Sequence, residues 1–111
     1  MDTLTHYRTI IVQLLQEYSQ YRPAYGDIRR EVVIDSIHDH YQLLSIGWQK
    51  HQRIHGTILH LDICDGKIWV QYDGTEEGIA NRLLASGIPA SEIVLAFHPP
   101  YKRSLGGFAV R

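Results

Sequence analysis

The sequence predicts a single α+β domain over residues 1–111: an N-terminal helix, a four-stranded, largely antiparallel sheet, a second helix and a short extended C-terminal segment. Three observations support this fold class. Apolar residues recur every three to four positions near the N-terminus, as they do along one face of a helix. Two alternating segments flank Asp65-Gly66, a dipeptide typical of tight hairpins. A chain of 111 residues is also too short to form two separate stable cores.

The first helix is predicted over residues 3–21. Apolar residues at alternating steps of three and four form a seam along it: Leu4, Tyr7, Ile11, Leu14, Tyr18 and Tyr21. Three further apolar residues widen this seam: Ile10, Val12 and Leu15. Asp2 or Thr3 can cap the free N–H groups at its start. Pro23 is expected to end the helix, because proline lacks the N–H donor and clashes with the preceding turn.

Two strands are predicted next, over residues 31–37 and 41–49, which are rich in β-branched and aromatic side chains. Residues 38–40, His-Asp-His, are the expected turn between them. The register of this pair is ambiguous in the sequence and is left open. Residues 50–56 are expected to connect the pair to a hairpin over residues 57–72.

That hairpin turns at Asp65-Gly66, because a type I′ turn needs positive φ at both central residues. This turn pairs Cys64 with Lys67, Ile63 with Ile68, Asp62 with Trp69, Leu61 with Val70, His60 with Gln71 and Leu59 with Tyr72. The face expected to meet the core carries Leu59, Leu61, Ile63, Ile68, Val70 and Tyr72. The opposite face carries His60, Asp62, Cys64, Lys67, Trp69 and Gln71. It is either a solvated sheet face or a protein-binding surface.

The second helix is predicted to begin after Thr75, the expected N-cap, with the acids of residues 76–77 in its first turn. Its expected buried stripe consists of Ile79, Ala80, Leu83 and Leu84. Gly87 supplies the left-handed residue that follows such a helix. Residues 93–97 are expected to form a short strand or an extended core segment, and the tail beyond them is expected to be irregular.

Composition and charge narrow the classes of function. The net charge of −1 and the pI near 6.6 disfavour an unassisted nucleic-acid binder. The single cysteine, Cys64, excludes an intrachain disulfide and fits a reducing compartment. No apolar run approaches the ~20 residues of a membrane span. We therefore expect a cytoplasmic protein that does not associate with membranes.

Metal and catalytic sites are not expected. His38 and His40 are separated by one residue, but no Cys/His set with zinc-ligand spacing accompanies them. Asp62, Asp65 and Lys67 partly match the acid-and-lysine cluster of Mg²⁺-dependent nucleases. The hairpin turn already explains Asp65, and a further acid at a supported position is missing. The sequence therefore predicts no cofactor, no metal ion and no catalytic residue, with an Mg²⁺-dependent nuclease as an alternative.

Three stretches carry a resemblance to a known family: residues 4–20, LTHYRTIIVQLLQEYSQ; residues 60–103, HLDICDGKIWVQYDGTEEGIANRLLASGIPASEIVLAFHPPYKR; and the ending Phe108-Ala109-Val110. The chain resembles the XisI family of excision controlling factors, found mainly in cyanobacteria. The resemblance implies a small α+β protein that supports programmed excision of a DNA element during differentiation of nitrogen-fixing cells. It also implies a separate recombinase that cuts and joins the strands, and a companion, XisH, that resembles restriction-type nucleases. The family supplies no catalytic residues that can be carried over.

The leading hypothesis is a non-enzymatic accessory factor that binds another protein, most simply a XisH-like companion. The expected binding surface is His60, Asp62, Trp69, Gln71, Pro99, Pro100 and Tyr101. A homodimer through part of this surface is also expected. The alternative is a factor that binds DNA directly through Lys50, Arg53, Lys102 and Arg103.

Overall fold

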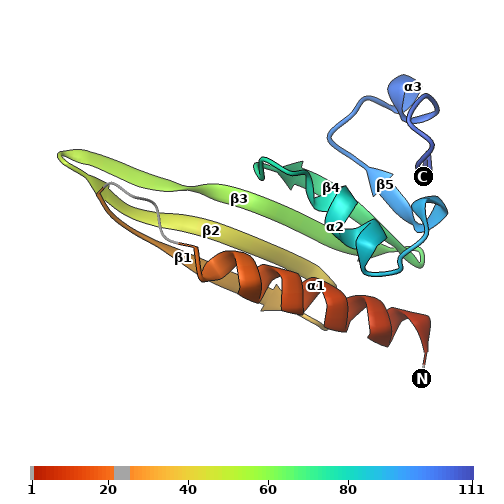
Figure 1. The fold of residues 1–111 in the computed structure, drawn as a ribbon, viewed down its shortest axis with the longest axis horizontal. Coiled ribbons are helices and arrows are strands. Elements are labelled where there is room, and N and C mark those ends of the chain that lie inside the picture. The colour runs from red at the N-terminus through yellow and green to blue at the C-terminus, as the bar shows by residue number, and fades with distance from the viewer. Residues whose placement is uncertain (1, 22–25) are drawn as a thin grey trace.

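The computed structural model describes residues 2–21 and 26–111. Its elements follow one another as α1 (Thr3–Ser19), β1 (Asp27–Asp35), β2 (His40–Gln49), β3 (Gln52–Cys64), β4 (Lys67–Asp73), α2 (Ile79–Ala85), the 3₁₀ turn η1 (Ala90–Glu92), β5 (Ile93–Leu95) and α3 (Pro100–Arg103). The strands form one sheet in chain order, and β1, β2 and β3 extend well beyond β4 and β5 (Figure 1). Within the described residues, no helix has both the length and the apolarity that crossing a membrane requires.

The sheet has five strands and is mixed, whereas the sequence predicted four strands in a largely antiparallel sheet. β1 to β4 pair antiparallel with their neighbours. β5 pairs in parallel with β4, because the segment that contains α2 carries the chain back before β5 begins. A strand of three residues leaves too short a pattern to be distinguished from an extended core segment by sequence.

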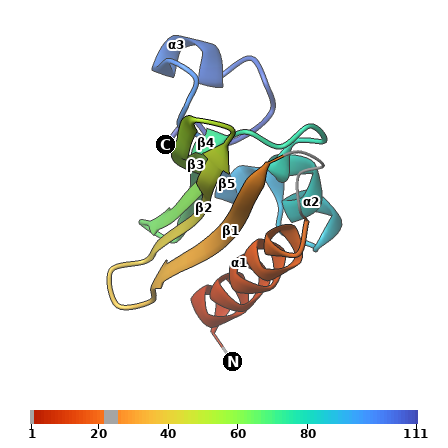
Figure 2. The ribbon, with the colours of Figure 1, turned by 90° about the vertical axis from the view of Figure 1, so that its left-hand side faces the viewer.

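The core lies between the sheet and the pair α1 and α2, which lie on the same side of the sheet (Figure 2). The predicted helix seam is largely confirmed, and α1 buries Tyr7, Ile10, Ile11, Leu14 and Leu15. The inner face of the sheet contributes Tyr41, Leu43, Leu59, Leu61, Ile63, Ile68 and Val70. Burying each such side chain contributes roughly 1.5–3 kcal/mol, so this contact is the main source of stability.

The ends of α1 settle one prediction and correct another. Asp2 is the N-cap, since its carboxylate accepts a hydrogen bond from the Thr5 N–H at 2.7 Å. The helix ends at Ser19, so Tyr21 lies outside it and is exposed rather than buried. The predicted stop at Pro23 lies outside the described residues.

The strands before the hairpin are longer than predicted. β1 begins at Asp27 and ends at Asp35, and residues 36–39 form the turn. Residues 52–56 were expected to be a connector, but they belong to β3 and pair with the end of β2. These residues are mainly polar and exposed, so their sequence lacks the alternation that marks a half-buried strand.

The Asp65-Gly66 turn is confirmed, with φ of 53° and 76° at the two residues. The four predicted pairs nearest the turn, from Cys64–Lys67 to Leu61–Val70, are also confirmed. Beyond them a β-bulge shifts the register, so that His60 pairs with Tyr72 and Leu59 with Asp73. The predicted pairs His60–Gln71 and Leu59–Tyr72 are therefore wrong. Because the bulge turns it outward, Tyr72 is 51% exposed rather than in the core.

The start of α2 also differs from the prediction. Thr75 does not cap the helix, which begins at Ile79 after Gly78. The carboxylate of Asp73 accepts hydrogen bonds from the N–H groups of both Ile79 (2.8 Å) and Thr75 (2.9 Å), and so caps it from six residues away. The two acids at 76–77 precede the helix. Gly87 has the predicted left-handed conformation, with φ of 96°.

An ion pair links α1 to the β1–β2 turn. Arg8 donates from Nε and Nη2 to the two carboxylate oxygens of Asp39 at 2.8 and 3.0 Å. The hydroxyl of buried Tyr41 donates to the same carboxylate at 2.8 Å. The hydrogen bonds from Arg8, together with that from Tyr41, lower the pKa of Asp39, and burial raises the pKa of Tyr41 to about 12.

Replacing Arg8 should destabilise the fold in a pH-dependent way. We expect Arg8→Met to lower the thermal midpoint at neutral pH by about 3–6 °C. Because the folded pKa of Asp39 lies below its unfolded value near 3.8, the contribution of the pair is present above that value. It is lost as the pH falls through the folded pKa, so the difference between variant and wild type should shrink in acid. Thermal unfolding followed by circular dichroism at a series of pH values measures this.

The matched control is Arg29→Met, which removes the exposed pair of Arg29 with Glu31 at 2.9 Å. Exposed pairs contribute little, so this variant should unfold close to the wild-type temperature. Equal destabilisation by the two substitutions would contradict the structural role of Arg8.

Candidate functional site

The outer face of the sheet, opposite α1 and α2, carries a row of three paired residues. His40 of β2 lies opposite Asp62 of β3, and Asp62 lies opposite Trp69 of β4. Side chains alternate between the two faces of a strand, so His60 shares the outer face with Asp62. The row therefore follows from the same register that points Leu61 and Val70 into the core.

The carboxylate of Asp62 is the centre of a polar cluster. One oxygen, Oδ1, lies 2.8 Å from His40 Nδ1 and also 2.8 Å from His60 Nε2. The other oxygen, Oδ2, accepts a hydrogen bond from Gln71 Nε2 at 3.2 Å. The Asp62 side chain is only 15% exposed. The hydrogen bond to Asp62 raises the pKa of His40 above its usual value.

Three of the residues predicted for the partner-binding surface therefore meet in one cluster, namely His60, Asp62 and Gln71. His40 completes the cluster, and sequence reasoning did not connect it with the others. Its partner was hidden because the register between β2 and β3 was left open. His38, the neighbour with which His40 was compared, instead contacts Asp35 within the β1–β2 turn, at 2.9 Å from Nδ1 to the carboxylate.

Trp69 connects this cluster to the C-terminal segment, residues 96–111. Its indole N–H donates to the Cys64 carbonyl at 3.2 Å, which holds the ring over the hairpin. The guanidinium of Arg103 lies 5.7 Å from the ring centroid, within the range of a cation–π contact. The ring is partly covered as a result and does not project freely.

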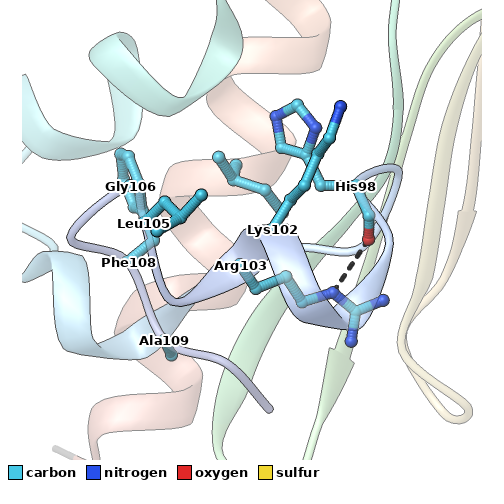
Figure 3. Close-up of a pocket in the computed structure, with 8 residues that line it drawn as sticks. His98, Lys102, Arg103, Leu105, Gly106, Phe108 and Ala109 are labelled. Carbon is cyan, nitrogen blue, oxygen red and sulfur yellow. Dashed lines mark hydrogen bonds between the residues drawn. The ribbon is translucent and has the colours of Figure 1, made fainter.

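Arg103 holds the C-terminal segment together. It donates to the carbonyls of His98 at 3.0 Å, Ala96 at 3.2 Å and Val110 at 3.4 Å (the first bond is drawn in Figure 3). The segment also returns to the sheet edge, where Ala109 forms a parallel bridge with Val94. A hollow of about 260 Å³ lies within this segment, lined in part by Leu95, Leu105 and Phe108.

Two large apolar side chains of this segment are exposed. Tyr101 is 73% exposed and Leu105 is 82% exposed. Pro99 is the N-cap of α3 and Pro100 is its first residue, so the two prolines fix the backbone next to Tyr101. The predicted surface residues thus lie in two places, the Asp62 cluster and the α3 turn, which the contact between Trp69 and Arg103 joins.

The residues of the DNA-binding alternative lie at two ends of the molecule. Lys50 is in the turn between β2 and β3, at the far tip of the long hairpin, whereas Lys102 and Arg103 lie in α3 (Figure 1). Arg53 stacks on Trp48 at 5.2 Å from the ring centroid. Arg53 and Arg103 both donate to backbone carbonyls. The four residues therefore form no continuous basic stripe along which a phosphate backbone would lie.

Comparison with known proteins identifies the fold and the family. The family model described as XisI protein matches residues 1–110. A XisI-like protein from Anabaena variabilis is similar in structure, with a TM-score of 0.91, 34% identity, and coverage of 98% of this chain and 100% of that one. The fdxN element excision controlling factor XisI, also from Anabaena variabilis, has a TM-score of 0.85 and 37% identity, with coverage of 99% and 100%. No curated protein sequence matches the chain.

Loss of the Arg103 side chain should loosen the C-terminal segment without unfolding the domain. We expect Arg103→Gln to speed amide exchange at Ala96 and Ala109 by about 10- to 100-fold, since lost hydrogen bonds to a charged donor lower the stability of a local unit by about 1.5–3 kcal/mol. Hydrogen exchange measured by NMR tests this. Lys102→Gln is the control, because Lys102 is exposed. Equal exchange rates in both variants would show that Arg103 does not anchor the segment.

Proposed function

This chain belongs to the XisI family, and from that membership we propose that it is a non-catalytic accessory factor in the excision of a DNA element. It would act by binding a companion protein, for which a XisH-like protein is the leading candidate. One of the similar proteins is named as an excision controlling factor of the fdxN element. The proposal extends that role to this chain and adds a binding surface.

The observation that carries the proposal is a pair of exposed apolar side chains on a firmly held segment. Tyr101 and Leu105 are exposed on a segment in which Arg103 donates to three backbone carbonyls. The bridge of Ala109 with Val94 ties the same segment to the sheet. Tyrosine is enriched at the energetic centres of interfaces. A segment that is ordered before binding also loses less conformational entropy when it binds.

The outer sheet face supplies the polar part of this surface. Aromatic residues surrounded by polar groups are typical of non-obligate interfaces, and here Trp69 lies between the Asp62 cluster and Arg103. The proposed binding surface therefore combines an apolar contact at α3 with the hydrogen-bonding groups of the Asp62 cluster. The surface would suit a partner with an apolar pocket next to polar side chains.

The proposal predicts that Tyr101→Ala and Trp69→Ala weaken binding to a XisH-like companion by about 10-fold or more each, a loss typical of central interface residues. Titration calorimetry with the two purified proteins measures the affinity. The control is Ile37→Ala, an equally apolar side chain that is 85% exposed in the β1–β2 turn. Unchanged affinity in both Tyr101→Ala and Trp69→Ala would remove this surface from the account.

The same variants test the expected homodimer. Sedimentation of the chain alone gives its mass, and a dimer that uses the α3 turn should dissociate in Tyr101→Ala but not in Ile37→Ala. A dimer that persists in Tyr101→Ala would place the contact between copies elsewhere.

A further inference from the structure

We propose that His40, His60 and Asp62 bind a divalent transition-metal ion such as Zn²⁺ on the outer face of the sheet. The three side chains each offer one ligand atom, and these atoms all lie within 4.8 Å of one another. They come from β2 and β3, two strands fixed by the central pairing of the sheet. This inference goes beyond the proposed accessory function and does not depend on it.

The geometry gathers three ligand atoms in one place, because both imidazole nitrogens lie beside the same carboxylate oxygen. His40 Nδ1 and His60 Nε2 each lie 2.8 Å from Asp62 Oδ1. In a tetrahedral site with bonds of about 2.0–2.2 Å, ligand atoms lie roughly 3.3–3.5 Å apart. Each of these two nitrogen–oxygen distances thus needs to lengthen by about half an ångström. Small rotations of the His40 and His60 side chains about their own bonds can supply this change.

The chemistry of the donors selects the class of metal. Two neutral imidazoles and one carboxylate suit Zn²⁺, Ni²⁺ and Cu²⁺, whereas Mg²⁺ and Ca²⁺ prefer sites made of oxygen atoms. Binding would replace any protons on the coordinating nitrogens, which leave to solvent, and the metal charge would compensate the carboxylate. No electron transfer is involved.

A further contact resembles the outer support found around metal ligands. Gln71 donates to Asp62 Oδ2 at 3.2 Å, which orients the carboxylate and leaves Oδ1 directed toward the histidines. Such supporting hydrogen bonds commonly tune metal affinity. The β-bulge between His60 and Leu61 lies in this same region, and bulges often redirect side chains at sites.

Three protein ligands leave a coordination position open, as in zinc sites that also bind water or substrate. The three ligands lie on the outer face, which Trp69, the residue paired with Asp62, shares. The open position would take a water molecule in the isolated chain. The ion would therefore add to this face of the sheet a positive charge and a coordination position whose water can be replaced by another ligand.

Titration of the purified, untagged chain with ZnCl₂ tests the proposal. We expect binding of one ion per chain, and a loss of affinity on the order of 100-fold in His40→Gln, His60→Gln or Asp62→Asn. Gln71→Leu should weaken binding by about 10-fold. MgCl₂ should give no binding. His38→Gln and His51→Gln are the controls, because both histidines are exposed and outside the cluster.

A second measurement uses only the wild-type chain, so it does not depend on the folding of a variant. The imidazole NMR signals of His40 and His60 should shift on adding ZnCl₂, while those of the other five histidines among seven should not. Shifts spread over all histidines, or equal losses of affinity in His38→Gln and His60→Gln, would indicate adventitious binding and overturn the proposal. The proposal would also be overturned if Zn²⁺ did not bind, or if it bound at a ratio other than one ion per chain.

Discussion

The register of the β3–β4 hairpin is the constraint on which the rest of the structure depends. The two left-handed residues Asp65 and Gly66 close the turn, and the pairs that follow place Leu61 and Val70 on the inner face. The same pairs place Asp62 and Trp69 on the outer face. A slip of one residue would expose the core side chains and bury the polar ones. Core and surface site are therefore two consequences of one turn.

The inner face of the sheet packs against the helices and forms the core, whereas the outer face is available for binding. Helices α1 and α2 cover only the inner face. Among residues 2–21 and 26–111, no helix covers the outer face except at its edge, where Arg103 of α3 reaches Trp69. Within the described residues, this edge is where the C-terminal segment meets the hairpin. The exposed Tyr101 of α3 and the polar cluster around Asp62 therefore belong to neighbouring parts of the surface.

Features that depend on residues close in sequence could be predicted, whereas features that depend on long-range contacts could not. The Asp65-Gly66 turn and the Asp2 cap depend on residues close in sequence, and both were predicted. The bulge at His60–Leu61 and the parallel pairing of β5 depend on partners elsewhere in the sheet. The cluster of His40 with Asp62 needed a register between β2 and β3 that the sequence left open. The capping of α2 by Asp73 was missed because the backbone loops back over six residues before the helix begins.

The central claim is that a partner binds a surface formed by the C-terminal segment and the adjoining outer face of the sheet. The most direct measurement is hydrogen exchange of the chain, free and in complex with a XisH-like companion, with exchange compared segment by segment. On binding, we expect slower exchange in β4 and residues 97–105 and unchanged exchange in the β2–β3 turn. Protection confined to α1 and α2, or to the tip of the β2–β3 hairpin, would contradict it.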